Sequence, residues 1–221
     1  MIGLVAADGC VKDENCVTIT SSLFDKHVAE IPKMVENAWD GLVKCYSAPH
    51  DSCVNSIRTI INRDKIGVFF GQYIQGKLTK KQFTKDVFAL SEQEILHALG
   101  GYFDGDGSFD VKNGILVANN YSQNMADQIW WMLVRVGIKA NITKLRLTGE
   151  HYQTKSTHYY HLIIPSSDVE KITPFMKSQK VPSDFVPRKT RNLRFFHEND
   201  GTRFLCQPIE TIESFSYTGS G

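Results

Sequence analysis

A seven-residue pattern occurs twice in this chain and constrains its fold more than any other feature. Residues 3–9 read Gly-Leu-Val-Ala-Ala-Asp-Gly, and residues 101–107 read Gly-Tyr-Phe-Asp-Gly-Asp-Gly. Asp8 and Asp106 are the equivalent carboxylates of the two copies, and they lie 98 residues apart. That period has the size of a small half-domain and is too long for a common solenoid repeat. The pattern therefore predicts two similar half-domains that each contribute one carboxylate.

The residues after the second copy predict a regular series of elements. Ser91 and Glu94 form a capping box that starts a helix near Glu92, and Gly107 ends that helix. Asn113-Gly114 is typical of a turn between two strands. The expected elements are a helix at 92–106, strands at 108–112 and 115–118, a helix at 125–136, strands at 138–148 and 152–164, and a short helix at 168–176.

The first half repeats this order less clearly. Its expected elements are a strand at 17–20, a helix at 28–38, strands at 42–46 and 53–61, and a helix at 65–74, with 77–89 linking the halves. We therefore expect an α+β fold made of a pseudo-two-fold repeat of αββαββα half-domains. The expected domains are 1–88 with the linker, 89–182, and a basic tail at 183–221.

Composition narrows the class of protein. The chain has 221 residues, of which 42% are hydrophobic, and no apolar run approaches the roughly 20 residues that span a bilayer. Its first residues lack the pattern of a secretory signal. The five cysteines, at positions 10, 16, 45, 53 and 206, are odd in number and widely spaced, so we expect reduced thiols and an intracellular protein.

The net charge of +1 hides an uneven distribution, because six basic residues lie between residues 177 and 194. They indicate either a patch that binds phosphates or a solvated charged face. The six are Lys177, Lys180, Arg188, Lys189, Arg191 and Arg194.

Small residues recur four apart in both copies, as Gly3 and Ala7 and as Gly101 and Gly105. Such faces let two helix backbones approach closely. The pairing would place both aspartates at adjacent helix C-termini, where backbone carbonyls lack intrahelical partners. Carboxylate and carbonyl oxygens together suit a hard divalent cation.

Two other interpretations of Asp-Gly after a helix compete with the metal site. A single Asp-Gly is commonly a cap and turn. An EF-hand loop starting at Asp104 would need Gly where the chain has Phe109 and Glu where it has Ile115, so we exclude it.

Residues 99–107, Leu-Gly-Gly-Tyr-Phe-Asp-Gly-Asp-Gly, resemble the LAGLIDADG motif of homing endonucleases, and residues 1–9 resemble a weaker first copy. The resemblance implies a monomeric, two-motif DNA endonuclease with the motif helices packed at its centre. Two antiparallel sheets would form a saddle over a long, asymmetric double-stranded target. Mg²⁺ or Mn²⁺ would be bound by Asp8 and Asp106, with the carbonyls of Ala7 and Gly105. Ala6 departs from the family pattern, which often has Asp there.

The family also keeps one lysine per half near the active site. Lys180-Val181-Pro182 and Lys81-Gln82-Phe83 are similar to that context, and these lysines follow Asp106 and Asp8 by 74 and 73 residues. Lys81 and Lys180 are then expected to stabilise developing charge or to help activate water. They could equally be ordinary surface lysines, with Lys80 and Lys177 as neighbouring alternatives.

Alternating polar residues along the expected strands are candidates for DNA contact, because a two-stranded ribbon fits the major groove. Any half-exposed sheet alternates in the same way. The phase of the alternation slips near Thr143-Lys144, which predicts a β-bulge. The candidates are Lys12, Ser108, Asp110, Lys112, Lys139, Asn141, Thr143, Lys144, Arg146, Gln153 and Lys155.

The segment 204–219 resembles the strand with which an intein's splicing domain resumes after its inserted endonuclease; it could also be a simple β-hairpin. The function expected overall is that of a sequence-specific double-strand DNA endonuclease. The alternative is a nucleic-acid-binding protein of the same fold without cleavage, such as an RNA maturase or a DNA-binding regulator.

Overall fold

The computed structural model describes residues 1–24, 28–50, 53–147, 156–188, 196–199 and 202–205. By their contacts, residues 1–190 form one compact unit and residues 191–221 a separate one. Of the second unit, an antiparallel hairpin of β11 (Phe196–Asn199) and β12 (Thr202–Leu205) is described. Most of the intein-like segment lies outside the described residues, as do Gln153 and Lys155. The domain boundaries at 88/89 and 182/183 stay predictions.

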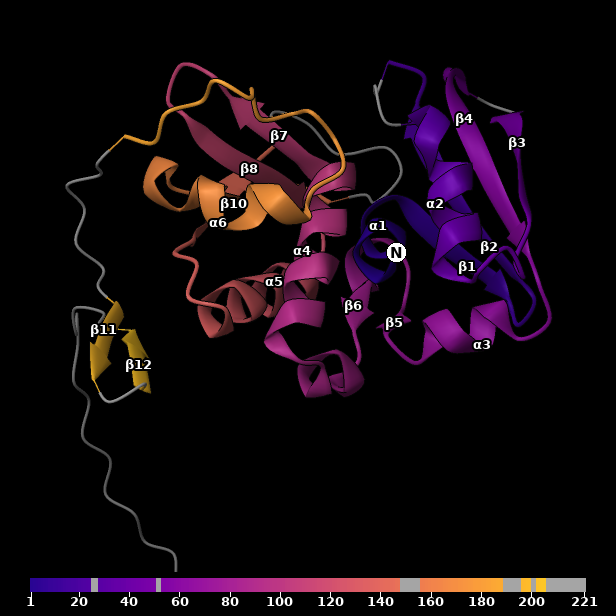
Figure 1. Cartoon of the computed structure of the whole chain (residues 1–221), viewed down its shortest axis with the longest axis horizontal. Coiled ribbons are helices and arrows are strands. Elements are labelled where there is room, and N and C mark those ends of the chain that lie inside the picture. The colour runs from indigo at the N-terminus through magenta and orange to yellow at the C-terminus, as the bar shows by residue number, and fades with distance from the viewer. Residues whose placement is uncertain (25–27, 51–52, 148–155, 189–195, 200–201, 206–221) are drawn as a thin grey trace, which may run out of the picture. The chain divides into compact units, whose positions relative to one another are not determined.

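The first unit contains the predicted pseudo-repeat (Figure 1). The first half consists of α1 (Ile2–Asp8), β1 (Gly9–Asp13), β2 (Cys16–Ser22), α2 (Ile31–Ala38), β3 (Cys45–His50), β4 (Cys53–Asn62) and α3 (Ile66–Gly71). The second half consists of α4 (Glu92–Asp106), β7 (Gly107–Asp110), β8 (Ile115–Asn120), α5 (Gln123–Arg135), β9 (Asn141–Arg146), β10 (His158–Ile164) and α6 (Val169–Ile172). The predicted αββαββα order and α+β class are confirmed.

Each half builds one antiparallel four-stranded sheet with the same strand order. The orders are β1-β2-β4-β3 and β7-β8-β10-β9. One face of each sheet is buried against helices, as Val17 and Ile19 show in the first sheet and Leu116 and Leu162 in the second. The helices α1 and α4 lie side by side between the two sheets (Figure 1).

Local signals end and begin the elements of the second half as expected. Ser91 accepts a hydrogen bond from the Glu94 backbone N–H, and the Glu94 carboxylate accepts one from the Ser91 N–H. Gly114, in the turn between β7 and β8, has φ +66°. Gly107 ends α4, but it does not have the left-handed backbone of a typical C-terminal glycine cap. Its backbone is extended, and a Cβ there would lie 2.2 Å from the Phe103 carbonyl oxygen.

The bulge predicted near Thr143 is wrong. The β9–β10 pairing runs without a shift from His158 opposite Arg146 to Ile163 opposite Asn141. Leu145 therefore shares a face with Thr143, while Lys144 and Arg146 share the opposite face with Ile142. Lys144 and Arg146 are exposed. The apparent slip in polarity arises because helices leave this end of the inner face uncovered.

The segment between the halves is structured. It contains a small hairpin of β5 (Ile74–Gln75) and β6 (Gln82–Phe83), with a 3-10 turn at Leu78–Lys80 between the strands. Gly76 has φ +75°, and a Cβ there would meet the Lys80 carbonyl oxygen at 2.0 Å, so the tight turn requires glycine. The hairpin presents Lys81 directly before β6.

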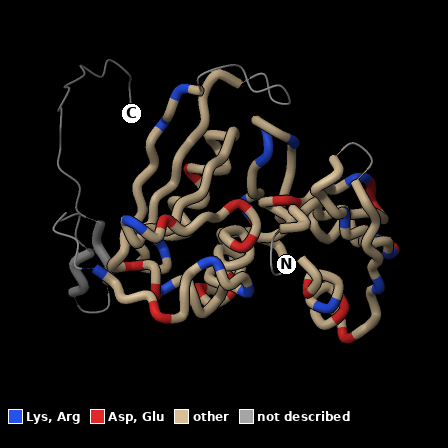
Figure 2. The backbone as a smooth tube through the Cα atoms, turned by 90° about the horizontal axis from the view of Figure 1, so that it is seen from above, with Lys and Arg blue, Asp and Glu red and all other residues tan. Residues whose placement is uncertain are grey.

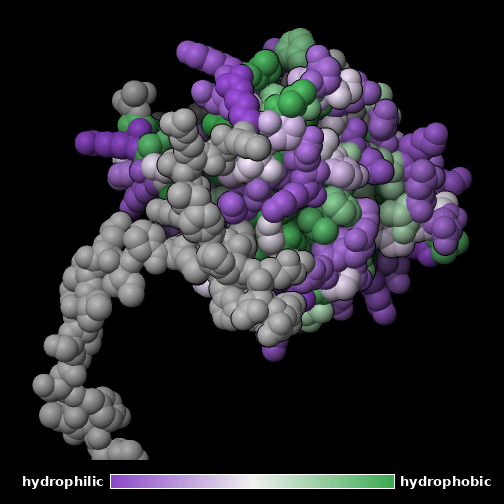
Figure 3. Space-filling model, turned by 60° about the vertical axis from the view of Figure 1, so that its left-hand side comes forward, coloured by the Kyte–Doolittle hydropathy of each residue, from purple (hydrophilic) through white to green (hydrophobic). Residues whose placement is uncertain are grey.

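The surface of the described residues is mixed in character. Lys and Arg occur on both halves of the unit (Figure 2). Small hydrophobic areas lie among polar residues on the face seen in Figure 3. No helix among the described residues is long and apolar enough to cross a membrane. Cys10, Cys16, Cys45 and Cys53 are free thiols.

Candidate active site

The two motif helices touch through their small residues, as predicted. A Cβ at Gly3 would lie 1.6 Å from the Ala98 carbonyl oxygen, and one at Gly101 would lie 3.1 Å from the Leu4 nitrogen. A Cβ at Gly105 would lie 2.5 Å from the Ala7 Cβ. Side chains at these glycines would push the backbones apart. The close crossing brings the C-terminal ends of α1 and α4 together.

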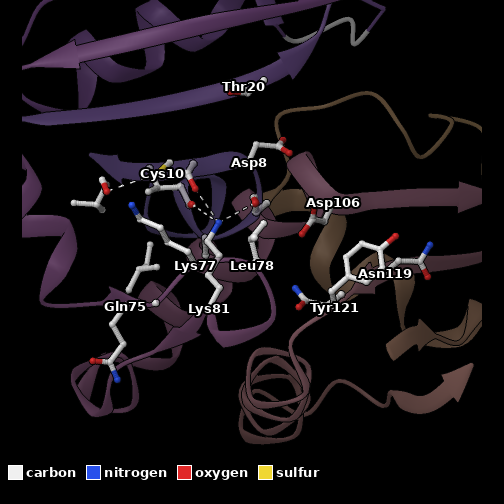
Figure 4. A pocket seen from close by; sticks show the side chains of 18 residues that line it. Asp8, Cys10, Thr20, Gln75, Lys77, Leu78, Lys81, Asp106, Asn119 and Tyr121 are labelled. Carbon is white, nitrogen blue, oxygen red and sulfur yellow. Dashed lines mark hydrogen bonds between the residues drawn. The ribbon is translucent and has the colours of Figure 1, made fainter. Parts of the chain in front are cut away.

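Asp8 and Asp106 end the two helices and line the same cavity, of about 810 Å³ (Figure 4). A Cβ at Gly105 would lie 2.7 Å from an Asp8 carboxylate oxygen. The Asp8 side chain therefore reaches across the helix pair to the residue that precedes Asp106. The structure thus brings the two predicted carboxylates into one site, to which Thr20 of the first sheet and Asn119 of the second also contribute.

The two predicted lysines make equivalent contacts. The Lys81 ammonium donates to the carbonyl oxygens of Val5, Ala7 and Gly9 at 3.2, 3.0 and 2.9 Å. The Lys180 ammonium donates to the carbonyl oxygens of Phe103, Asp104 and Gly105, the last at 2.9 Å. Each lysine therefore satisfies orphan carbonyls at the C-terminus of its own motif helix and offsets the negative end of the helix dipole.

Burial shifts the ionisation of this cluster. Desolvation raises the pKa of Asp106, although Lys81, a hydrogen bond from Tyr102 and Lys180 act in the opposite direction. Desolvation lowers the pKa of Lys81, and Asp106 and Asp8 partly counter it. An extra cation beside the two carboxylates would stabilise their charged forms.

Tyr102 is hydrogen-bonded to Asp106. It is fully buried in α4, and its hydroxyl accepts a hydrogen bond from the Asn120 side chain at 3.0 Å. Desolvation, followed by the nearby Asp106 charge, raises the pKa of Tyr102 well above its usual range, so it acts as a neutral donor. Tyr102 thereby connects the motif helix to the end of β8.

The two lysine-bearing segments are held in different ways. Asp104, which is 2% exposed, accepts hydrogen bonds from the backbone N–H groups of Lys177 and Ser178, both at 2.8 Å. This contact anchors the approach to Lys180. Its counterpart in the first half, Ala6, has no such group.

In the first half, side chains of α5 hold the hairpin that carries Lys81. The Gln128 amide bonds both backbone groups of Phe83 at 2.8 Å, and Asn124 donates to the Gln82 side chain at 2.8 Å. The second half-domain therefore positions the lysine of the first.

The oxygen ligands at the site fit Mg²⁺ or Mn²⁺. Mg²⁺ is commonly held by one or two carboxylates together with substrate phosphates and water, and Asp8 and Asp106 supply the two carboxylates. The carbonyl oxygens of Ala7 and Gly105, which were also expected to bind metal, already accept hydrogen bonds from the lysines. No group of three or more His, Cys, Asp or Glu residues gathers elsewhere in the described ranges.

The candidates for DNA contact do not all share one surface. The strand registers place Ser108, Asp110, Asn141 and Thr143 on the face of the second sheet that is turned away from the helices. Lys144 and Arg146 are on the other face. The remaining described candidates are Lys12, exposed at an irregular point of β1; Lys112, in the turn after β7; and Lys139, just before β9.

The basic run after residue 176 also divides. Lys180 lies inward against the end of α4, whereas Arg188 donates to the Lys112 carbonyl oxygen at 2.9 Å. Lys189, Arg191 and Arg194 are outside the described residues. Lys180 and Arg188 therefore make contacts within the fold and are not simply charges on the surface.

A family model of the LAGLIDADG-like domain matches residues 93–174. The match runs from α4 through α6 and so spans the elements of the second half. A search of curated protein sequences gave no match. Similarity to solved structures extends the likeness to both halves.

Three solved structures illustrate the shared fold. Mesophilic variants of the homing endonuclease I-DmoI have 16% sequence identity and a TM-score of 0.52, covering 79% of this chain and 91% of that one. I-DmoI in complex with DNA and Mn has the same identity and TM-score over 79% and 92%. Full-length DUF199/WhiA from Thermatoga maritima has 13% identity and a TM-score of 0.52 over 81% and 54%. The chain therefore shares the fold of these structures across both of its halves.

Sequence reasoning missed several residues of the site. Asn119, Asn120 and Tyr121 line the cavity, and Tyr102 donates a hydrogen bond to Asp106. Asn119 and Asn120 follow the apolar run Ile115–Ala118, and this change from apolar to polar residues indicates the end of a strand. The spacing of residues in the sequence does not connect these asparagines to the aspartates.

Replacing Lys81 by Met is expected to lower the free energy of unfolding by about 1–3 kcal/mol, because backbone carbonyls at the end of α1 lose their donor. Lys77 lines the same cavity but is exposed, so Lys77→Met should change stability by less than about 0.5 kcal/mol. Urea denaturation of both variants measures the difference. Equal stability of the two variants would show that Lys81 does not cap the helix in solution.

Proposed function

We propose that this protein is a sequence-specific, metal-dependent DNA endonuclease that cuts both strands of a duplex. The observation that carries the proposal is the convergence of Asp8 and Asp106, from the two copies of one motif, on a single cavity between two sheets. A site with two equivalent carboxylates suits a substrate with two equivalent strands. The proposed target is long and asymmetric, since the two halves differ in sequence.

Asp8 and Asp106 would hold Mg²⁺ or Mn²⁺, each serving one strand. An ion bound there would supply Lewis-acid activation of water and would offset charge on the phosphate. Lys81 and Lys180 hold the helix ends in place and keep positive charge beside the carboxylates. Tyr102 donates to Asp106 and orients its carboxylate. The lysines are thus proposed to act first by fixing the geometry of the site and second by stabilising developing negative charge.

DNA would lie along the faces of the two sheets that are turned away from the helices. Thr20 and Asn119 lie where these faces meet the cavity, so a duplex on the sheets would pass over Asp8 and Asp106. The solved I-DmoI complex with DNA and Mn supports both the partner and the metal. Phosphate contacts would position the duplex, and side chains of the sheets would read bases.

Cleavage of a plasmid tests the proposal. The plasmid carries the two gene segments that flank the coding region of this chain, joined directly to each other; this joined sequence is called the junction. We expect linear product with Mg²⁺ and none with EDTA. A plasmid without the junction is the matched control. Binding to the junction without any cleavage, with either Mg²⁺ or Mn²⁺, would overturn the enzymatic proposal.

The second candidate function is nucleic-acid binding without cleavage. It is favoured by the hydrogen bonds that Ala7 and Gly105 already make to ammonium groups, because these reduce the ligands open to a metal. The fold is also similar to that of full-length DUF199/WhiA, whose name does not designate an endonuclease. The plasmid assay separates the two functions.

We further propose that the chain is the endonuclease region of an intein that acts inside the cell. The proposal rests on the likeness of segment 204–219 to a resumed splicing domain. The flanking sequence of the encoding gene tests it. A host protein interrupted on both sides is expected, whereas a gene without host segments would contradict it.

The metal-free protein should melt at a higher temperature at pH 7 when Asp106 is replaced by Asn. Burial raises the pKa of Asp106 in the folded state above its unfolded value of about 3.9. The folded state then binds more protons than the unfolded state as pH rises from that value toward the folded pKa, so the wild type loses stability across this window. The neutral Asn escapes that loss.

Thermal melts at several pH values check the sign of this effect. The advantage of the Asn variant should disappear near pH 3.5, where Asp106 is protonated in both states. At pH 7, added Mg²⁺ should raise the melting temperature of the wild type and leave that of the variant nearly unchanged. A variant less stable than the wild type at pH 7 without metal would contradict the assigned burial of the charge.

A further inference from the structure

An asparagine and a histidine pair beside the candidate active site. The β8–β10 register places Asn119 opposite His161, and the β9–β10 register places Thr143 opposite the same histidine. Gly107 pairs with Ala118 at the end of the β7–β8 ladder, so Asp106, the last residue of α4, directly precedes the ladder on one side and Asn119 follows it on the other. The row of Thr143, His161 and Asn119 on the open face of the second sheet therefore ends beside the start of β7, which Asp106 directly precedes.

The two side chains are joined by a hydrogen bond of 2.7 Å between His161 Nδ1 and Asn119 Oδ1. A neutral imidazole that donates through Nδ1 keeps Nε2 as an acceptor, and the Asn119 amide keeps its N–H donors. If the amide were turned around, the imidazole would keep a donor and the amide an acceptor. In both arrangements the pair presents one donor and one acceptor.

The surroundings preserve this pattern. Desolvation lowers the pKa of His161 below its usual value, so the ring is neutral at pH 7. Asn119 is exposed and lines the catalytic cavity, where Figure 4 shows it on the same side as Tyr121. The polar edge of the pair is thus available to a ligand that lies on the open sheet.

We propose that Asn119 and His161 act together as a reader of one adenine in the major groove, next to the strand cleaved at Asp106. Adenine is the single base whose major-groove edge has both an acceptor, N7, and a donor, the N6 amino group. Guanine offers two acceptors, while cytosine offers a donor and thymine an acceptor. The inference rests on the proposed function, since it requires DNA on this sheet.

Selection of bound duplexes from a randomised pool, in the absence of divalent metal, tests the inference. The wild type should yield a consensus in which one position prefers adenine roughly tenfold or more. Asn119→Ala and His161→Ala should each lose that preference at the same position and keep the rest of the consensus. Asn119→Asp, which keeps the size of the side chain but removes its donor, should lose it as well.

Glu170→Ala, at an exposed position of α6, is the matched control and should leave the whole consensus unchanged. Thermal melts establish that each variant is folded. A consensus that the Asn119 and His161 variants leave intact, or one with guanine at the affected position, would overturn the inference and leave the proposed function standing. A wild type that selects no consensus would overturn the proposed function and the inference together.

Discussion

Asp106→Asn should abolish double-strand cleavage while leaving DNA binding within a few-fold of the wild type. The substitution keeps the size of the side chain and its place at the end of α4, but it removes the charge that would hold the metal. A metal that activates water and stabilises phosphate charge contributes several kcal/mol. The rate should therefore fall by at least about 10³-fold.

Single-turnover cleavage of the junction plasmid and gel-shift binding to the same DNA measure the two properties. Asp8→Asn should have the same effect, because Asp8 occupies the equivalent place in the first half. Asp184→Asn removes an exposed carboxylate away from the cavity and is the control. Undiminished cutting by Asp106→Asn would mean that the metal is bound elsewhere.

Gly3→Ala should destabilise the protein by about 3 kcal/mol, at the upper end of the effect of overpacking. A single methyl group at Gly3 would lie 1.6 Å from the Ala98 carbonyl oxygen, so α1 and α4 would have to separate. Leu4 and Val5 beside it are fully buried, and their packing would move with the helix. Because the carboxylates sit at the ends of these helices, cleavage by any folded fraction should also fall.

Gly71→Ala is the matched control for this substitution. Gly71 is the last residue of α3, and a Cβ there would meet no atom within 4 Å. Alanine at a helical position without steric conflict should be neutral or slightly stabilising. Urea denaturation of the two variants would reject the close helix crossing if Gly3→Ala were as stable as Gly71→Ala.

Local sequence signals predicted the elements well where one physical cause dominated. The capping box at Ser91 and Glu94 and the turn at Gly114 were predicted because each rests on contacts within a few residues. The nearly equal spacing of Lys81 and Lys180 from the aspartates reflected a repeated fold, and the structure places them on the equivalent carbonyls of Ala7 and Gly105.

The bulge expected in the second sheet is wrong because packing by distant elements sets the pattern of polarity there. Leu145 and Lys144 suggested a bulge because the sequence does not reveal where helices stop covering a strand. The Asn119–His161 contact joins residues that are 42 positions apart in the sequence, so no local pattern predicts it. The contacts of Gln128 with Phe83 likewise cross from one half to the other.

The sequence by itself determined that two copies of one motif would build two similar halves, each with a carboxylate at a helix end. Repetition, glycine spacing and helix capping can be recognised from the order of residues alone. Only the tertiary structure decided that Asp8 reaches over Gly105, that lysines occupy the carbonyls beside the aspartates, and which polar residues share the open sheet. These depend on helix crossing and strand register, which are set by contacts between residues far apart in the chain.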